Sequence, residues 1–119
     1  MRIFFIGTVK FSEGLLNELL KYDEFEIIAI ATKKKSAFNS DHSDLSLIAK
    51  NNKIPYRYVN NINSDDNYNW IKYLKPDIIY CFGWSSLIKK RLLNVSKNGV
   101  IGYHPTCLPK NRGRHPIIW

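Results

Sequence analysis

One histidine stands where an apolar stretch ends, and it is the residue of this sequence best placed to do chemistry. His104 closes the stretch GVIGYH (99–104), and prolines at positions 105 and 109 restrict the backbone that follows. An imidazole can act as a general acid, a general base or a stabiliser of an oxyanion. Arg112 and Arg114 flank Gly113, and their guanidinium groups suit a carboxylate or a phosphate. A lone histidine is more often structural than catalytic, so the catalytic interpretation depends on its position at a strand end.

A short turn near the start of the chain is a second candidate. Gly7 and Thr8 follow the apolar run 2–6 and precede a helical pattern, where backbone N–H groups can hold an anion. A plain turn between a strand and a helix explains these residues about equally well. The turn lacks the G-x-G-x-x-G pattern, so a dinucleotide fingerprint is unsupported.

Aromatic residues mark the end of a third apolar run. Phe82 and Trp84 surround Gly83 directly after the run 77–82. Their rings either seal the edge of the core or line a slot for a flat heterocycle. The sequence leaves both interpretations open.

A polar segment, 33–43, is predicted to be a loop, and loops of this kind contact substrates when a rigid scaffold holds them. A solvated loop is the default interpretation. His42 lies beside Asp41 and Asp44, but no second histidine or cysteine completes a ligand set. We therefore expect no metal.

These candidates need elements that bring them to one place. The pattern predicts a first strand, then a helix with Ser12 as its N-cap, and later a helix capped by Ser64. Strands are expected over 2–6, 25–32, 55–59, 77–82 and 99–104, and helices over 11–22, 44–52, 64–74 and 85–93. This alternation predicts a Rossmann-like, doubly wound α/β fold with a mainly parallel sheet and helices on both faces. Such sheets bind ligands beyond the carboxyl ends of their strands, so the candidates share one edge.

Composition sets further bounds. The 119 residues suffice for one small domain, and no apolar run is long enough to cross a membrane. Cys81 and Cys107 lack metal-ligand spacing, which is typical of free thiols in a reducing cytoplasm. The net charge of +8 fits a tRNA or another phosphate-bearing partner, although lysines on solvated faces explain it as well.

Three stretches together resemble one family. HPTCLPKNRGRHPI (104–117) is similar to the H-x-S-L-L-P-x-x-R-G-x-x-P-I signature of the formyltransferases that use 10-formyltetrahydrofolate, a family that includes methionyl-tRNA formyltransferase and the sugar N-formyltransferases. MRIFFIGTVKFSEGLLNELL (1–20) resembles the opening of the methionyl-tRNA enzymes, and LKPDIIYCFGWSSLIKKRLLN (74–94) resembles a later strand and turn. The resemblance covers the whole chain.

The resemblance implies a role for individual residues. His104 falls on the family's catalytic histidine, and Thr106 stands where the family has a serine. The donor 10-formyltetrahydrofolate is implied to contact Phe82, Gly83, Trp84, Ser85 and Leu87. The acceptor is implied to contact Gly7, Thr8, Phe11, Thr106, Arg112 and Gly113.

The sequence departs from the family pattern in two ways. Gly102 occupies the position where the family usually has an asparagine, and the family's catalytic aspartate would fall beyond Trp119. We therefore expect residues 1–119 to be an N-terminal formyl-donor domain that is truncated before its last elements and inactive alone. The apolar residues 117–119 would then lack cover, and a homodimer is one way to bury them.

The predicted function is formyl transfer from 10-formyltetrahydrofolate to a primary amine. The acceptor is a nucleotide-linked amino sugar, which Gly102 and the stretch 104–119 slightly favour, or methionyl-tRNA, which the opening stretch and the charge favour. The alternative is a truncated or degenerate domain that binds folate or a nucleotide without turnover. An RNA-binding module rests on charge alone.

Overall fold

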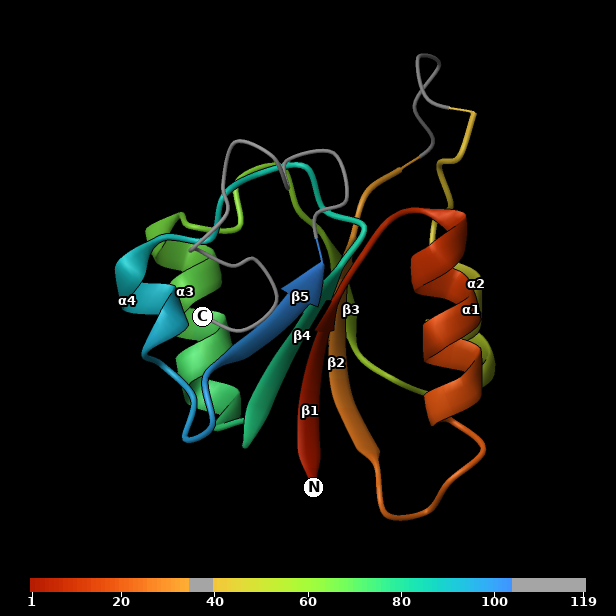
Figure 1. Cartoon of the computed structure of the whole chain (residues 1–119), viewed down its shortest axis with the longest axis horizontal. Coiled ribbons are helices and arrows are strands. Elements are labelled where there is room, and N and C mark those ends of the chain that lie inside the picture. Colours follow the sequence, from red (N-terminus) through yellow and green to blue (C-terminus); the bar gives the residue numbers. More distant parts are fainter. Residues whose placement is uncertain (35–39, 104–119) are drawn as a thin grey trace.

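The fold is a five-stranded parallel sheet, in a computed structural model that describes residues 1–34 and 40–103 (Figure 1). The strands lie in the order β3-β2-β1-β4-β5, and all four neighbouring pairs are parallel. The strands are β1 (Arg2–Ile6), β2 (Glu26–Thr32), β3 (Tyr56–Tyr58), β4 (Ile78–Phe82) and β5 (Val100–Tyr103). The helices are α1 (Lys10–Leu19), α2 (Ser46–Asn51), α3 (Asp65–Leu74) and α4 (Lys90–Leu93). The predicted doubly wound α/β fold is confirmed.

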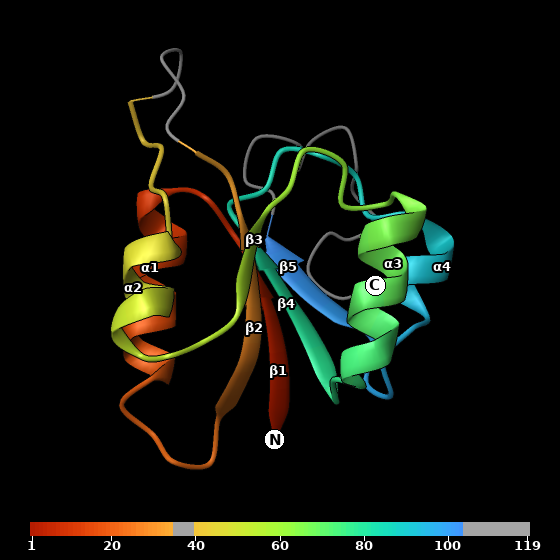
Figure 2. The ribbon, with the colours of Figure 1, turned by 180° about the vertical axis from the view of Figure 1, so that it is seen from behind.

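The helices form two layers, one on each face of the sheet. Figures 1 and 2 show α1 and α2 on one side of the strands and α3 and α4 on the other. The chain runs outward from β1 through β2 to β3 and then returns to β4, on the other side of β1. Because parallel crossovers keep one hand, this reversal moves the later helices to the opposite face.

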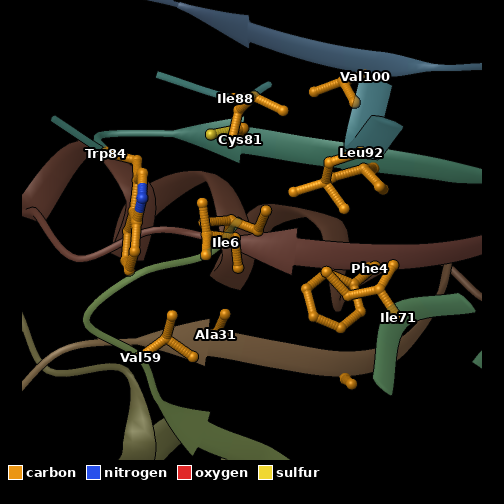
Figure 3. Close-up of a cluster of buried hydrophobic side chains, with 13 residues drawn as sticks. Phe4, Ile6, Ala31, Val59, Ile71, Cys81, Trp84, Ile88, Leu92 and Val100 are labelled. Atoms are coloured by element: carbon orange, nitrogen blue, oxygen red, sulfur yellow. The ribbon is translucent and has the colours of Figure 1, made fainter. Parts of the chain in front are cut away.

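Both faces of the central strands are buried, which explains their continuous apolar runs. On one face Phe4 and Ile6 pack against Ile71 of α3 and Leu92 of α4 (Figure 3). On the other face Ile3 and Phe5 belong to a second apolar cluster, which includes the following helix residues: Leu16, Leu19 and Ala49. Successive side chains of a strand point to opposite faces, so one short run supplies both cores.

Two local predictions were wrong. Ser12 is the third residue of α1, and Val9 stands at its N-cap. The helix expected over 85–93 is limited to Lys90–Leu93, because residues 83–89 form an irregular loop that buries Trp84 and Ile88 and leaves Leu87 exposed. The other predicted cap is confirmed, since Ser64 Oγ accepts a hydrogen bond from the backbone N–H of Asn67 at 3.2 Å.

Candidate functional site

The candidate site lies where β1 and β4 end side by side. The strand order reverses between these two strands, and ligands of doubly wound sheets bind beyond the carboxyl ends at such a point. Two connections meet there: the β1–α1 turn (7–9) and the β4–α4 loop (83–89). The predicted donor and acceptor segments are therefore brought to the same edge.

Two glycines allow these connections to touch. A Cβ atom on Gly7 would lie 2.7 Å from the carbonyl oxygen of Phe82, which is closer than real Cβ atoms come. Gly83 has a φ of +71°, and a Cβ there would collide with Val9 and Ser12. Both positions thus require glycine for close backbone approach, and Gly83 also needs it for its left-handed conformation.

Ser12 of α1 makes a hydrogen bond to the end of β4, beside the two connections. Its hydroxyl donates to the carbonyl oxygen of Phe82 and accepts from the N–H of Val9 at 3.3 Å. The side chain is completely buried. A hydroxyl that both donates and accepts in this way joins the start of α1 to the end of β4.

The loop after β2 is fastened to the same turn through Thr8 and His42. The Thr8 hydroxyl lies 3.4 Å from Nδ1 of His42 and 3.3 Å from the carbonyl oxygen of Ser43. The other ring nitrogen, Nε2, lies 3.0 Å from the carbonyl oxygen of Lys33. A carbonyl only accepts, so Nε2 carries the proton in this contact. His42 is thereby engaged on both nitrogens as a structural clamp.

The N–H groups of Val9, the N-cap of α1, and of Lys10, its first residue, have partners within the protein. Val9 donates to Ser12, and the N–H of Lys10 donates to the carbonyl oxygen of Asp41 at 2.9 Å. These donors are occupied, so the plain-turn interpretation of Gly7 and Thr8 explains the described contacts.

Trp84 and Phe82 take different roles at the end of β4. The Trp84 side chain is 2% exposed and lies beside Ile6 and Val59, so it seals the edge of the core (Figure 3). Among residues 1–34 and 40–103 its Nε1–H has no hydrogen-bond partner, and Nζ of Lys33 lies 4.7 Å from the ring centroid. Phe82 is half-buried, and its ring centroid lies 6.0 Å from that of Phe11.

The two remaining residues that are predicted to contact the formyl donor, Ser85 and Leu87, lie at the crest (85–87) of the β4–α4 loop. Ser85 is exposed, and the Leu87 side chain is 65% exposed. Asn63, on the β3–α3 connection, holds this loop through two hydrogen bonds, and no sequence pattern points to it. Neither Asn63 nor the clamping role of His42 belongs to a spacing pattern, because each depends on contacts between distant segments.

Gly102, which stands where the family usually has an asparagine, lies in β5. Gly102 of β5 is buried and pairs in register with Cys81, which pairs on its other side with Ile6. Burial raises the pKa of the Cys81 thiol to about 12, so this group is a packing residue and not a nucleophile.

Several predicted site residues fall outside the described part of the chain: His104, Thr106, Arg112 and Gly113. Tyr103, which directly precedes His104 in the sequence, pairs with Phe82 at the carboxyl end of β4. Within residues 1–34 and 40–103, no three histidine, cysteine or acidic side chains form a group suited to a metal ion. No helix in the same ranges has the length and apolar character needed to cross a membrane.

Comparisons with known proteins agree with this architecture. The protein-family model described as formyl transferase matches residues 1–119. Methionyl-tRNA formyltransferase of Thermotoga maritima is 25% identical over 121 residues, which cover 98% of this chain and 38% of that protein. The enzyme of the same name from Ehrlichia canis is 31% identical over 122 residues, covering 98% of this chain and 40% of that protein. The chain thus spans about two fifths of the length of these relatives.

A solved structure shows the same fold. Phosphoribosylglycinamide formyltransferase from Anaplasma phagocytophilum superposes with a TM-score of 0.64 at 15% sequence identity, over 88% of this chain and 50% of that one. At this identity the likeness concerns the fold alone. The match of the family model along the whole chain settles the family, and this protein belongs to the formyl transferases.

Proposed function

We propose that this protein transfers a formyl group from 10-formyltetrahydrofolate to a primary amine. Membership in the family implies a folate-derived formyl donor. The observation that carries the proposal is the close approach of the β1–α1 turn and the β4–α4 loop, beside the bond from Ser12 of α1 to Phe82 of β4. These are the segments that resemble the acceptor and donor regions of the family, and they share the edge where sheets of this kind bind ligands.

The chemistry follows from the resemblance. The nitrogen of the amine attacks the formyl carbon and forms a C–N bond, which gives a tetrahedral intermediate with a negative oxygen. Protonated His104, with the hydroxyl of Thr106 nearby in the sequence, stabilises that oxygen. The attacking nitrogen then gives up a proton, the C=O bond reforms as the bond from the carbon to N10 of the folate breaks, and N10 takes up a proton. The products are the formylated amine and tetrahydrofolate.

Exposure differs among the residues of the β1–α1 turn and the β4–α4 loop, and it favours different roles for them in contacting the donor and the acceptor. Trp84 is buried, so the exposed Ser85 and Leu87 on the same loop are available to touch the donor. Gly7 and Gly83 act by allowing close backbone approach. Phe11, whose side chain is 58% exposed beside Phe82, is a contact on the acceptor side.

Two acceptors remain, and each has an observation in its favour. Methionyl-tRNA is favoured by the names of the similar relatives and by the net charge of +8. A nucleotide-linked amino sugar is favoured by Gly102 and by the divergent stretch 104–119. We propose a cytoplasmic location, because Cys81 and Cys107 have the spacing of free thiols, which a reducing compartment maintains.

The test is the release of tetrahydrofolate by the complete protein with 10-formyltetrahydrofolate and a panel of amines. The panel contains methionyl-tRNA and nucleotide-linked amino sugars. The His104→Ala variant should keep its circular dichroism and melting temperature while losing transfer. Wild-type transfer by this variant would overturn the catalytic assignment, whereas folate binding without turnover by any amine would favour the non-catalytic alternative.

A further inference from the structure

We propose that Asn63 is a positioning residue for the formyl donor, acting through the β4–α4 loop. The inference rests on the proposed function, because that function makes this loop a donor contact. Asn63 lies on the connection between β3 and α3, outside the three stretches, 1–20, 74–94 and 104–117, that carry the resemblance most clearly. In Figures 1 and 2 this connection and the β4–α4 loop run side by side at the carboxyl edge of the sheet.

One side-chain amide holds two backbone groups of the loop. Nδ2 of Asn63 donates to the carbonyl oxygen of Leu87 at 2.8 Å. Oδ1 of Asn63 accepts from the N–H of Lys89, also at 2.8 Å. The amide therefore pairs with the loop as a neighbouring strand would. Only this orientation satisfies both contacts, because the reversed amide would set donor against donor and acceptor against acceptor.

Ile88 lies between the two residues that Asn63 contacts, and its burial shows how the two hydrogen bonds orient the loop. Ile88 is 4% exposed and belongs to the core cluster on the face of the sheet that α3 and α4 cover (Figure 3). With Ile88 pointing inward, the Leu87 side chain points outward and is 65% exposed. The two hydrogen bonds thus set which loop residues enter the core and which ones are presented to a ligand.

Asn63 is itself held in place. Its N–H donates to Oδ1 of Asn61 at 3.0 Å, and its carbonyl oxygen accepts from a guanidinium nitrogen of Arg91 at 3.2 Å. The guanidinium of Arg91 also pairs with Asp65 and lies 4.2 Å from the ring centroid of Tyr68. A clamp that is supported on both sides holds its partner loop in one geometry, which is the condition for a preorganised site.

The opposite end of the loop has its own anchor. Ser12 bonds to the carbonyl oxygen of Phe82, and Gly83 packs against Val9. Trp84 is buried directly after this anchor. The loop is therefore fixed at its beginning by α1 and at its end by Asn63, and its exposed crest lies between them. Loss of the Asn63 clamp should loosen the donor side of the site while the turn near the acceptor stays in place.

The experiment compares three variants in the complete protein. Asn63→Ala removes both bonds to the loop. Asn63→Asp keeps an acceptor for Lys89 but loses the donor to Leu87. Asn67→Ala is the matched control, because Nδ2 of Asn67 donates to the carbonyl oxygen of Asn61 at 2.8 Å in the same connection and no contact joins its side chain to the loop in the described structure. For each protein we would measure the KM for 10-formyltetrahydrofolate, the KM for the acceptor and the melting temperature.

We expect Asn63→Ala to raise the KM for the donor about tenfold, equivalent to about 1.4 kcal/mol, with the KM for the acceptor within twofold of wild type. Asn63→Asp should raise the donor KM by a smaller factor, and Asn67→Ala should leave it unchanged. Hydrogen exchange at the Lys89 amide should be faster in Asn63→Ala than in Asn67→Ala.

Two different failures can be told apart. If the wild type uses the donor but the donor KM of Asn63→Ala and Asn63→Asp stays within twofold, or both KM values rise equally, the positioning role is wrong while the proposed function stands. If the wild type neither binds nor consumes 10-formyltetrahydrofolate, the proposed function fails and the donor role of Asn63 fails with it.

Discussion

The hydroxyl of Ser12 donates a hydrogen bond to the carbonyl oxygen of Phe82, which lies 70 residues further along the chain. This bond joins the first turn of α1 to the end of β4 at the point where the strand order reverses. Ser12 is fully buried, and both bonds of its hydroxyl are partly buried, so water has limited access to them. The geometry of the candidate site therefore depends on one side chain of α1.

Replacement of Ser12 by alanine should destabilise the protein. The carbonyl of Phe82 and the N–H of Val9 would lose this partner; because both bonds are only partly buried, we expect a loss near the lower end of the range of about 1–3 kcal/mol for unsatisfied buried groups. Urea unfolding of Ser12→Ala against wild type measures the loss. Asn17→Ala, at an exposed position of the same helix, is the control and should change stability little. Equal stabilities for the two variants would show that the Ser12 bond contributes nothing.

Two glycines should respond to alanine in opposite directions. Gly83 has a φ of +71° and no room for a Cβ, so Gly83→Ala should cost at least about 2 kcal/mol. Gly14 lies within α1, with no atom within 4 Å of the Cβ position, so Gly14→Ala should stabilise by about 0.5–1 kcal/mol. Thermal unfolding of both variants tests the pair, and a stabilising Gly83→Ala would refute the close approach of the β1–α1 turn and the β4–α4 loop.

The buried thiol of Cys81 should make stability fall at high pH. Burial raises its pKa from 9.0 to about 12, so between these values the unfolded chain releases a proton that the folded chain keeps. The unfolded state then binds fewer protons, and the free energy of unfolding decreases by up to about 1.4 kcal/mol per pH unit as pH rises. Below pH 9 this thiol has no effect, because it is protonated in both states.

The measurement is the free energy of unfolding against pH in a Cys107→Ser background, with and without Cys81→Ala. Other groups titrate in the same range in both proteins, so only the difference in slope belongs to Cys81. We expect the alanine variant to lose less stability between pH 9 and pH 11. Parallel curves for the two proteins would contradict the burial argument.

The sequence by itself determined the order of the elements and the edge on which the candidate segments 7–8 and 82–87 lie. Apolar runs such as 2–6 and 78–82 are buried on both faces, and a parallel strand buried in this way has a continuous apolar sequence. The cap at Ser64 was also predictable, because its partner lies only three residues away. Local patterns of this kind need no knowledge of the rest of the molecule.

Only the tertiary structure decided which residues hold the edge together. Ser12 looked like a helix cap, yet its partner is the carbonyl of Phe82 from a distant strand. Asn63 belongs to no sequence pattern. Its two bonds hold the β4–α4 loop in the region where the sequence predicted a helix over 85–93 and the structure has one only over Lys90–Leu93. A hydrogen bond between segments far apart in the chain leaves no periodic trace in the sequence, so it is visible only once the sheet has brought the two segments together.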